Sequence, residues 1–448
     1  MKEMLCIDFG NSFTKVAVRK TADSPSSLLT DTGVTTDSLN ACVPTVAGQF
    51  SDGRWFYGLE LEMFNQDVEG MTVYRNWKPQ FFQMPNIELM PGIAGVVPAT
   101  PRRRGRPPKS LKSASGLDYH MIGVGYFRWL RNFWDGACRK VTGQPCSEIP
   151  VRVTLPSFGA QSGAELKLKN ILMEAGWLFD NAFPVLPEPL ANVIGALSNG
   201  ANKQNPRGTD ADYGQMFRET GLFQRMRKLY EHGGSPVAWT LIVDVGGFTT
   251  DFAMLGIDLE LLSANLDREV EGKPGLKHKS IPLGIADLDR RVLEALPESK
   301  KPHFERLGAR VSSSFLDGFH VNVYGKPVTR QKLSGGPVIG ETESERRAIR
   351  DVIAVFAGQV ANGAEDFLSQ HNHDRIDDVI LTGGGTMIHE VSNTLSKRLK
   401  HYKYEVAHCH IPTGEEAKPP FRRLSKQLPR GGTAIGGTSL YFDFATNE

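Results

Sequence analysis

A short motif that occurs twice, far apart in the chain, constrains the fold more than any other feature of the sequence. The copies are residues 7–18 (IDFGNSFTKVAV) and 243–254 (VDVGGFTTDFAM). Four identities align: Asp8 with Asp244, Gly10 with Gly246, Thr14 with Thr250 and Ala17 with Ala253. In each copy two apolar runs flank a glycine-containing turn, which predicts a β-hairpin. The separation far exceeds the period of a solenoid, so we expect two similar domains that each open with this hairpin.

The residue types in these hairpins suit phosphate and a divalent cation. An aspartate at the end of a buried strand can hold such a cation directly or through water. Glycine lets backbone N–H groups approach phosphate closely, and Lys15 offers a compact positive charge. Two hairpins that face each other would hold a polyphosphate and its magnesium from both sides. Each hairpin taken alone is equally consistent with an ordinary polar turn.

The remaining pattern alternates strands with helices, which favours an α/β fold. Apolar residues at three- and four-residue spacing predict helices at 118–143, 285–296 and 344–370. A capping box at Ser162 and Glu165 predicts another helix, which we expect to end just before Gly176. Further strands are expected at 42–47, 151–155 and 379–381, and a further helix from 187 onward.

Five motifs in order resemble those of the actin-like ATPase superfamily, from residue 8 to residue 437. Those similar to its two phosphate motifs are Asp8-x-Gly10-Asn11-x-x-x-Lys15 and Asp244-x-Gly-Gly-x-Thr-Thr-Asp251. The first connecting helix is matched by Pro187-Glu188-Pro189-x-Ala191 and the second by Gly431-Gly-Thr-Ala-Ile-Gly-Gly437. The adenosine loop is matched by Leu381-Thr-Gly-Gly-Gly385. The Asn and Lys of the first motif and the Glu of the connecting helix look most like the bacterial plasmid-segregation actins, the ParM and Alp proteins.

This resemblance implies an actin-like fold, with two RNase H-like domains around a nucleotide cleft. Domain I would span 1–198, with a basic, proline-rich loop at 79–117. An insertion would follow at 199–236, then domain II at 237–430. Residues 431–448 would form a C-terminal helix that returns to domain I. The implied activity is ATP hydrolysis coupled to filament assembly, with disassembly after hydrolysis, for plasmid segregation or cytoskeletal positioning.

The resemblance also implies a set of site residues. Glu188 would orient the attacking water, and Asp8 and Asp244 would hold Mg²⁺ largely through water. All three residues are predicted to be catalytic. The nucleotide, ATP with GTP left open, would contact Gly10, Asn11, Ser12, Lys15, Gly246, Gly247, Thr249, Thr250, Gly383, Gly384 and Gly385. Positioning and charge neutralisation are what phosphoryl transfer to water requires. Taken alone, Glu188 is better explained as an acidic residue favoured by the positive end of a helix dipole; the neighbouring motifs favour the catalytic role.

A basic segment stands apart from the rest of the chain. Six of the 52 basic residues lie within 102–112, so the remainder is mildly acidic. Arg104-Gly105-Arg106-Pro107 looks like the core of an AT-hook, whose arginines enter the narrow minor groove of A·T-rich DNA. Direct DNA contact through 101–109, or a DNA-binding adaptor, is one hypothesis. A solvated basic loop is the other.

Composition excludes several other classes. Five scattered cysteines without a CxxC spacing argue against a disulfide scaffold or a zinc module and favour a reducing cytoplasm. The first residues leave no room for a signal peptide, and no apolar run is long enough for a membrane helix. We therefore expect a cytoplasmic protein without a membrane partner. The rival functions are a small-molecule kinase and a non-polymerising chaperone or reactivase of the same fold.

Overall fold

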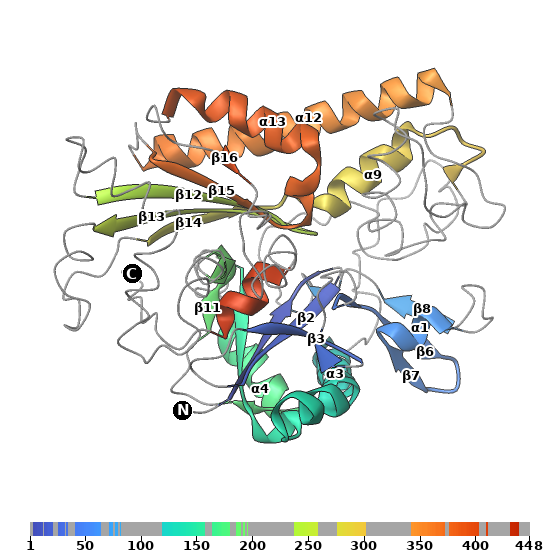
Figure 1. The fold of residues 1–448 in the computed structure, drawn as a ribbon. Helices are drawn as coiled ribbons and strands as arrows, with labels where there is room; N and C mark the ends of the chain where they lie inside the picture. Colours follow the sequence, from blue (N-terminus) through green and yellow to red (C-terminus); the bar gives the residue numbers. More distant parts are fainter. Residues whose placement is uncertain are drawn as a thin grey trace, which may run out of the picture.

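The chain has an α/β architecture in the computed structural model, with helices flanking mixed sheets (Figure 1). The described residues are 3–11, 13–20, 26–31, 33–34, 41–63, 71–74, 77–78, 81, 119–156, 164–179, 185–189, 191–192, 195, 237–258, 276–301, 342–371, 376–402, 409–410 and 431–438. Three of the predicted contact residues, Ser12, Arg104 and Arg106, lie outside these ranges. So does the predicted insertion at 199–236.

The first hairpin forms the middle of one sheet. The strands of this sheet are β1 (Met4–Phe9), β2 (Phe13–Arg19), β3 (Ser27–Thr30), β4 (Gly33–Val34), β5 (Val43–Pro44), β9 (Pro150–Leu155), β10 (Leu178–Phe179) and β11 (Leu186–Pro187). Their order is β10-β9-β1-β2-β3-β4, while β5 pairs with β2 and β11 with β9. β1 runs antiparallel to β2 and parallel to β9. The predicted hairpin is therefore confirmed.

The second hairpin forms the middle of another sheet with matching topology. Its strands are β12 (Val237–Val245), β13 (Thr250–Asp258), β14 (Leu276–Ile281), β15 (Asp378–Thr382) and β16 (Cys409–His410). The order is β14-β13-β12-β15-β16, with β12 antiparallel to β13 and parallel to β15. The order β3-β2-β1-β9-β10 in the first sheet has the same relative strand directions. The repeated motif thus marks a repeated strand arrangement.

Each sheet buries one apolar face under helices. In the first sheet, Leu5, Ile7 and Phe9 share a core with α3 (Tyr119–Thr142) and α4 (Ala164–Glu174). In the second, alternate residues of β12 pack with α9 (Ile285–Ala295), α12 (Glu343–Gln370) and α13 (His389–Arg398). These helices lie on the outer sides of the two sheets (Figure 1). The sheets therefore turn their other faces, which carry Asp8 and Asp244, toward each other.

The predicted helix ends agree with the structure. α3 ends before Gly143, whose φ of 88° lies in the left-handed region that favours glycine. Gly176, just beyond α4, has a φ of 83°. The loop predicted at 79–117 is wrong at Phe81, which lies in a helical turn and is fully buried. Its N–H donates to the carbonyl of Trp77, and its ring packs on Phe9 because the aromatic core extends past β1.

Two helical segments cross beside the first sheet. One includes residues 188–189, 191–192 and 195; the other is residues 431–437, coloured red in Figure 1. A Cβ at Gly436 would overlap the carbonyl oxygen of Ala191, and one at Gly195 would overlap that of Gly432. The second segment also packs on the first sheet, where a Cβ at Gly437 would overlap the Sγ of Cys6. Backbone therefore meets backbone at this crossing.

A small third sheet stands at the edge of the first. It has the order β7-β6-β8. Its strands are β6 (Ala47–Phe50), β7 (Trp55–Tyr57) and β8 (Met71–Tyr74), with the short helix α1 (Leu59–Met63) beside them. The extended segment predicted at 42–47 corresponds to β5 and the start of β6. No helix in the described part of the chain is long and apolar enough to cross a membrane.

Candidate functional site

The first hairpin presents an ion pair at the end of β1. Asp8 and Lys15 are cross-strand partners, so their side chains lie on the same face of the sheet. Lys15 Nζ donates to Asp8 Oδ2 at 2.5 Å, and both side chains are largely buried. The turn that joins the strands needs glycine at position 10, because a Cβ there would overlap the carbonyl oxygen of Phe13. Asn11 in this turn is also buried.

The second hairpin places two aspartates opposite each other. Asp244 lies one residue before the end of β12 and pairs directly with Asp251 on β13. Asp251 is buried and accepts hydrogen bonds from the hydroxyls of Thr249 and Ser280. The turn between them is closed by a bond of 2.9 Å from the Gly246 N–H to the Thr249 carbonyl. These contacts hold the Asp251 carboxylate in place beside Asp244 at one edge of the second sheet.

The turn of the second hairpin caps the N-terminus of α9. The N–H groups of Ile285 and Ala286 donate to the carbonyls of Gly246 and Gly247 at 3.0 and 2.8 Å. The Thr250 hydroxyl donates to the carbonyl of Leu283 at 2.6 Å. The predicted phosphate-binding turn is therefore fixed in place by the helix behind it.

The glycine run after β15 packs against Asp244. Gly383 has a φ of 82°, and a Cβ there would overlap Asp244 Oδ1. A Cβ at Gly385 would overlap Val245 Cγ1. Gly384 between them is half-buried. The structure thus brings Gly383 and Gly385 to the second hairpin, while their contact with adenosine stays a prediction.

Glu188 lies at the start of the helical segment that follows β11. Pro189 suits the first turn of a helix, where its missing N–H costs nothing. Lys78 Nζ donates to Glu188 Oε1 at 3.0 Å, and both side chains are about one-tenth exposed. Lys78 also lies over the ring of Phe9, 5.4 Å from its centroid. Glu188 is therefore held by a cation that comes from beside the aromatic core of the first sheet.

Asn192 connects the same helical segment to the second sheet. It lies four residues after Glu188, on the same helix face. Its Nδ2 donates to Asp244 Oδ2, and its Oδ1 accepts a bond of 3.1 Å from the Thr382 hydroxyl. All three side chains are buried. This bridge fixes the position of Asp244 relative to Glu188.

Neighbouring carboxylates help to raise the pKa of Glu188 and of Asp244. Burial is the largest cause that raises the pKa of Glu188 to about 8; Lys78 opposes the shift, while Asp8, Asp251 and Asp244 add to it. Burial, with Asp251 and Asp8, also raises the pKa of Asp244 to about 7, against the opposing effects of Lys15 and Asn192. Burial alone would lower the pKa of Lys15, but Asp8 and Asp244 contribute to raising it. The site carries more acidic than basic groups.

This donor set fits a hydrated divalent cation. Four carboxylates from both sheets and the connecting segment face two ammonium groups, so a cation would relieve the excess negative charge. Among the described residues, no group of three or more His, Cys, Asp or Glu side chains is arranged to bind a metal directly. Binding of Mg²⁺ by Asp8 and Asp244, largely through water, stays a prediction.

We expect cation binding to release protons. The folded apo protein binds protons at Glu188 and Asp244 more tightly than the unfolded chain does. Its free energy of unfolding therefore falls as pH rises from about 4 to about 8. A divalent cation with ADP favours the ionised carboxylates, so about one proton should leave per site at pH 7. Calorimetry in buffers of different ionisation enthalpy measures that number, and a value of zero contradicts the assignment.

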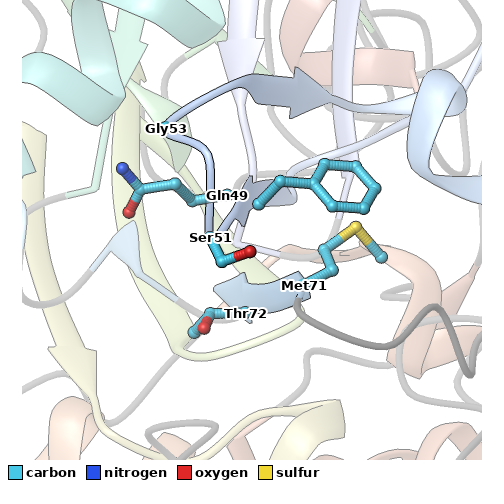
Figure 2. Close-up of a pocket in the computed structure, with 6 residues that line it drawn as sticks. Gln49, Ser51, Gly53, Met71 and Thr72 are labelled. Atoms are coloured by element: carbon cyan, nitrogen blue, oxygen red, sulfur yellow. The ribbon is translucent and has the colours of Figure 1, made fainter.

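A separate depression lies on the small third sheet. Figure 2 shows its lining: Gln49, Phe50, Ser51, Gly53, Met71 and Thr72. It carries no titratable side chain, and it comes from strands β6 and β8 and the β6–β7 turn rather than from the two hairpins. We therefore place the candidate site at the carboxylates and not in this depression.

Sequence reasoning missed Lys78 and Asn192. Lys78 lies just before the predicted loop at 79–117, and nothing in the sequence around it points to the site. Asn192 carried a better signal, because its spacing from Glu188 places both on one helix face. No model of a known protein family matches the chain, and no curated protein matches it.

Proposed function

We propose that the chain is an actin-like ATPase whose site lies between the two sheets. The observation that carries the proposal is the repeated strand arrangement, which brings Asp8, Asp244 and Asp251 together with Glu188. Two matched hairpins that face each other provide aspartates for a hydrated cation and glycine turns for phosphate. We place ATP, with GTP as the alternative, in a cleft between two RNase H-like domains.

Each side chain then has a role in hydrolysis. Lys15 would bind phosphate oxygens while it stays paired with Asp8. Glu188, held by Lys78, would orient the attacking water; Asp8 and Asp244 would hold the hydrated Mg²⁺. The bound cation would supply neutralisation of phosphate charge. Gly383, Gly384 and Gly385 would pack against the adenosine, and Gly10, Asn11, Ser12, Gly246, Gly247, Thr249 and Thr250 would line the phosphates.

The resemblance to plasmid-segregation actins extends the proposal to filaments. We propose that ATP drives self-assembly in the cytoplasm, that hydrolysis leads to disassembly, and that the filament moves or positions DNA. Pelleting and light scattering with Mg²⁺ and ATP, ADP or no nucleotide test this directly. Assembly with ATP alone supports a filament. Hydrolysis by a chain that stays monomeric would instead favour the small-molecule kinase or the chaperone, and a substrate screen would separate those two.

Contact with DNA is proposed for residues 101–109. The Arg-Gly-Arg-Pro core at 104–107 suits the minor groove of A·T-rich duplex, where arginine meets enhanced negative potential. Deleting 102–109 should lower affinity for A·T-rich duplex by at least tenfold while ATP hydrolysis is unchanged, since several phosphate and groove contacts are lost together. Filter binding at fixed salt measures this loss. If the deletion variant and the wild type bind A·T-rich duplex with equal affinity, residues 101–109 do not contact DNA. A DNA-binding adaptor would then be the remaining hypothesis.

A further inference from the structure

The strand register repeats an aspartate–threonine pair in the two sheets. Asp244 at the end of β12 is the register partner of Thr382 on the parallel strand β15. Asp8 at the end of β1 is likewise the register partner of Thr154 on the parallel strand β9. Partners on neighbouring strands lie side by side on one face. The two pairs are therefore equivalent positions, and their surroundings can be compared directly.

A side chain bridges the pair in the second sheet. The hydroxyl of Thr382 donates to Asn192 Oδ1, and the amide of the same asparagine donates to Asp244 Oδ2. One amide thus satisfies a buried hydroxyl and a buried carboxylate together. All three residues are at most 7% exposed.

The pair in the first sheet has no such bridge within the described residues. Thr154 is fully buried, and its Oγ1 has no hydrogen-bond partner among them. Its side chain lies beneath the segment 431–437, because a Cβ at Gly437 would come within 3.3 Å of Thr154 Cγ2. Asp8 accepts from Lys15 through Oδ2. A buried hydroxyl left unpaired costs free energy, so this position suits a small polar group that bonds both Thr154 and Asp8.

We propose that Thr154 is a positioning residue that holds an ordered water against Asp8, and that this water belongs to the hydration shell of the bound cation. The inference rests on the proposed function, because it needs a divalent cation at Asp8. A buried water typically makes about three hydrogen bonds to otherwise unpaired polar groups. Thr154 and Asp8 supply two of these partners. In the second sheet the side chain of Asn192 takes the place that we assign to water in the first. The two aspartate–threonine pairs therefore differ in what bridges them.

The test compares Thr154→Val, which removes the hydroxyl, with Thr154→Ser, which keeps it. Thr240→Val is the matched control, since Thr240 is another fully buried threonine without a partner for its hydroxyl among the described residues. It lies four residues before Asp244 on β12, about 13 Å along the strand. Thermal melting of the apo full-length chain should give an equal or higher Tm for both valine variants, because an unpaired hydroxyl is removed.

Binding then separates a positioning role from a structural one. Mn²⁺ affinity in the presence of ADP, read from the electron paramagnetic resonance of free Mn²⁺, should fall about fivefold in Thr154→Val and recover in Thr154→Ser. Thr240→Val should match the wild type. Equal Mn²⁺ affinity of wild type and Thr154→Val overturns the role of Thr154. A wild-type chain that binds neither ADP nor Mn²⁺ overturns the proposed function instead.

Discussion

Replacing Glu188 with glutamine should lower the rate of ATP hydrolysis by about 10²- to 10⁴-fold, the usual contribution of a positioned acid or base. Glutamine keeps the shape of the side chain but lacks the carboxylate charge with which Glu188 would orient the attacking water. ATP should still bind, because Lys15 and both hairpins are intact. If the chain forms filaments, those of the variant should last longer, since their loss follows hydrolysis. Phosphate release and light scattering on the same sample measure both effects.

Stability measurements show whether lost activity reflects chemistry or unfolding. Burial and the neighbouring aspartates raise the pKa of Glu188 to about 8, so glutamine resembles the neutral form that the folded apo protein favours. The Tm of Glu188→Gln at pH 8 should therefore equal or exceed that of the wild type. Glu174→Gln, at an exposed position on α4, is the control and should hydrolyse ATP at the wild-type rate. Unchanged hydrolysis in Glu188→Gln would remove Glu188 from the mechanism.

Replacing Gly436 with alanine should destabilise the protein by about 3 kcal/mol, the upper part of the usual range for overpacking. The added Cβ would overlap the carbonyl oxygen of Ala191 and approach the N–H of Gly195. These are backbone atoms of the segment that carries Glu188 and Asn192, so they cannot rotate away as a side chain can. Chemical denaturation of the apo chain measures the loss.

Gly136 offers a matched control for that substitution. It lies within α3, and a Cβ there would meet nothing within 4 Å. Gly136→Ala should therefore stabilise the chain by about 1 kcal/mol, because alanine has the better helix propensity. The two glycine-to-alanine changes are expected to have opposite signs. A loss of similar size in both would show that the contact at Ala191 is not the cause.

Local patterns in the sequence predicted most of the elements that build the site. The two hairpins and the C-terminal ends of α3 and α4 depend on alternation and on turn residues, which can be read over a few residues. The mixed α/β class followed from the order of those elements. These features need no knowledge of how distant segments pack.

Contacts between distant segments could not be predicted in the same way. Lys78 reaches Glu188 across 110 positions, and Asn192 reaches Asp244 across 52. Both contacts depend on how the connecting segment lies against the two sheets. The proline- and glycine-rich composition of 79–117 predicts a loop at Phe81, whereas its burial is decided by the aromatic side chains of the first sheet. Tertiary packing overrode local composition there.

The shared carboxylates also give the molecule a mechanical property. Asp8 belongs to one sheet, Asp244 and Asp251 belong to the other, and each contributes to raising the pKa of Glu188. Their repulsion therefore acts between the two halves of the chain and increases as protons leave. A cation placed among them would convert that repulsion into attraction. The work needed to separate the halves thus depends on pH and on the bound cation, whereas added salt should change it little because buried charges are only weakly screened.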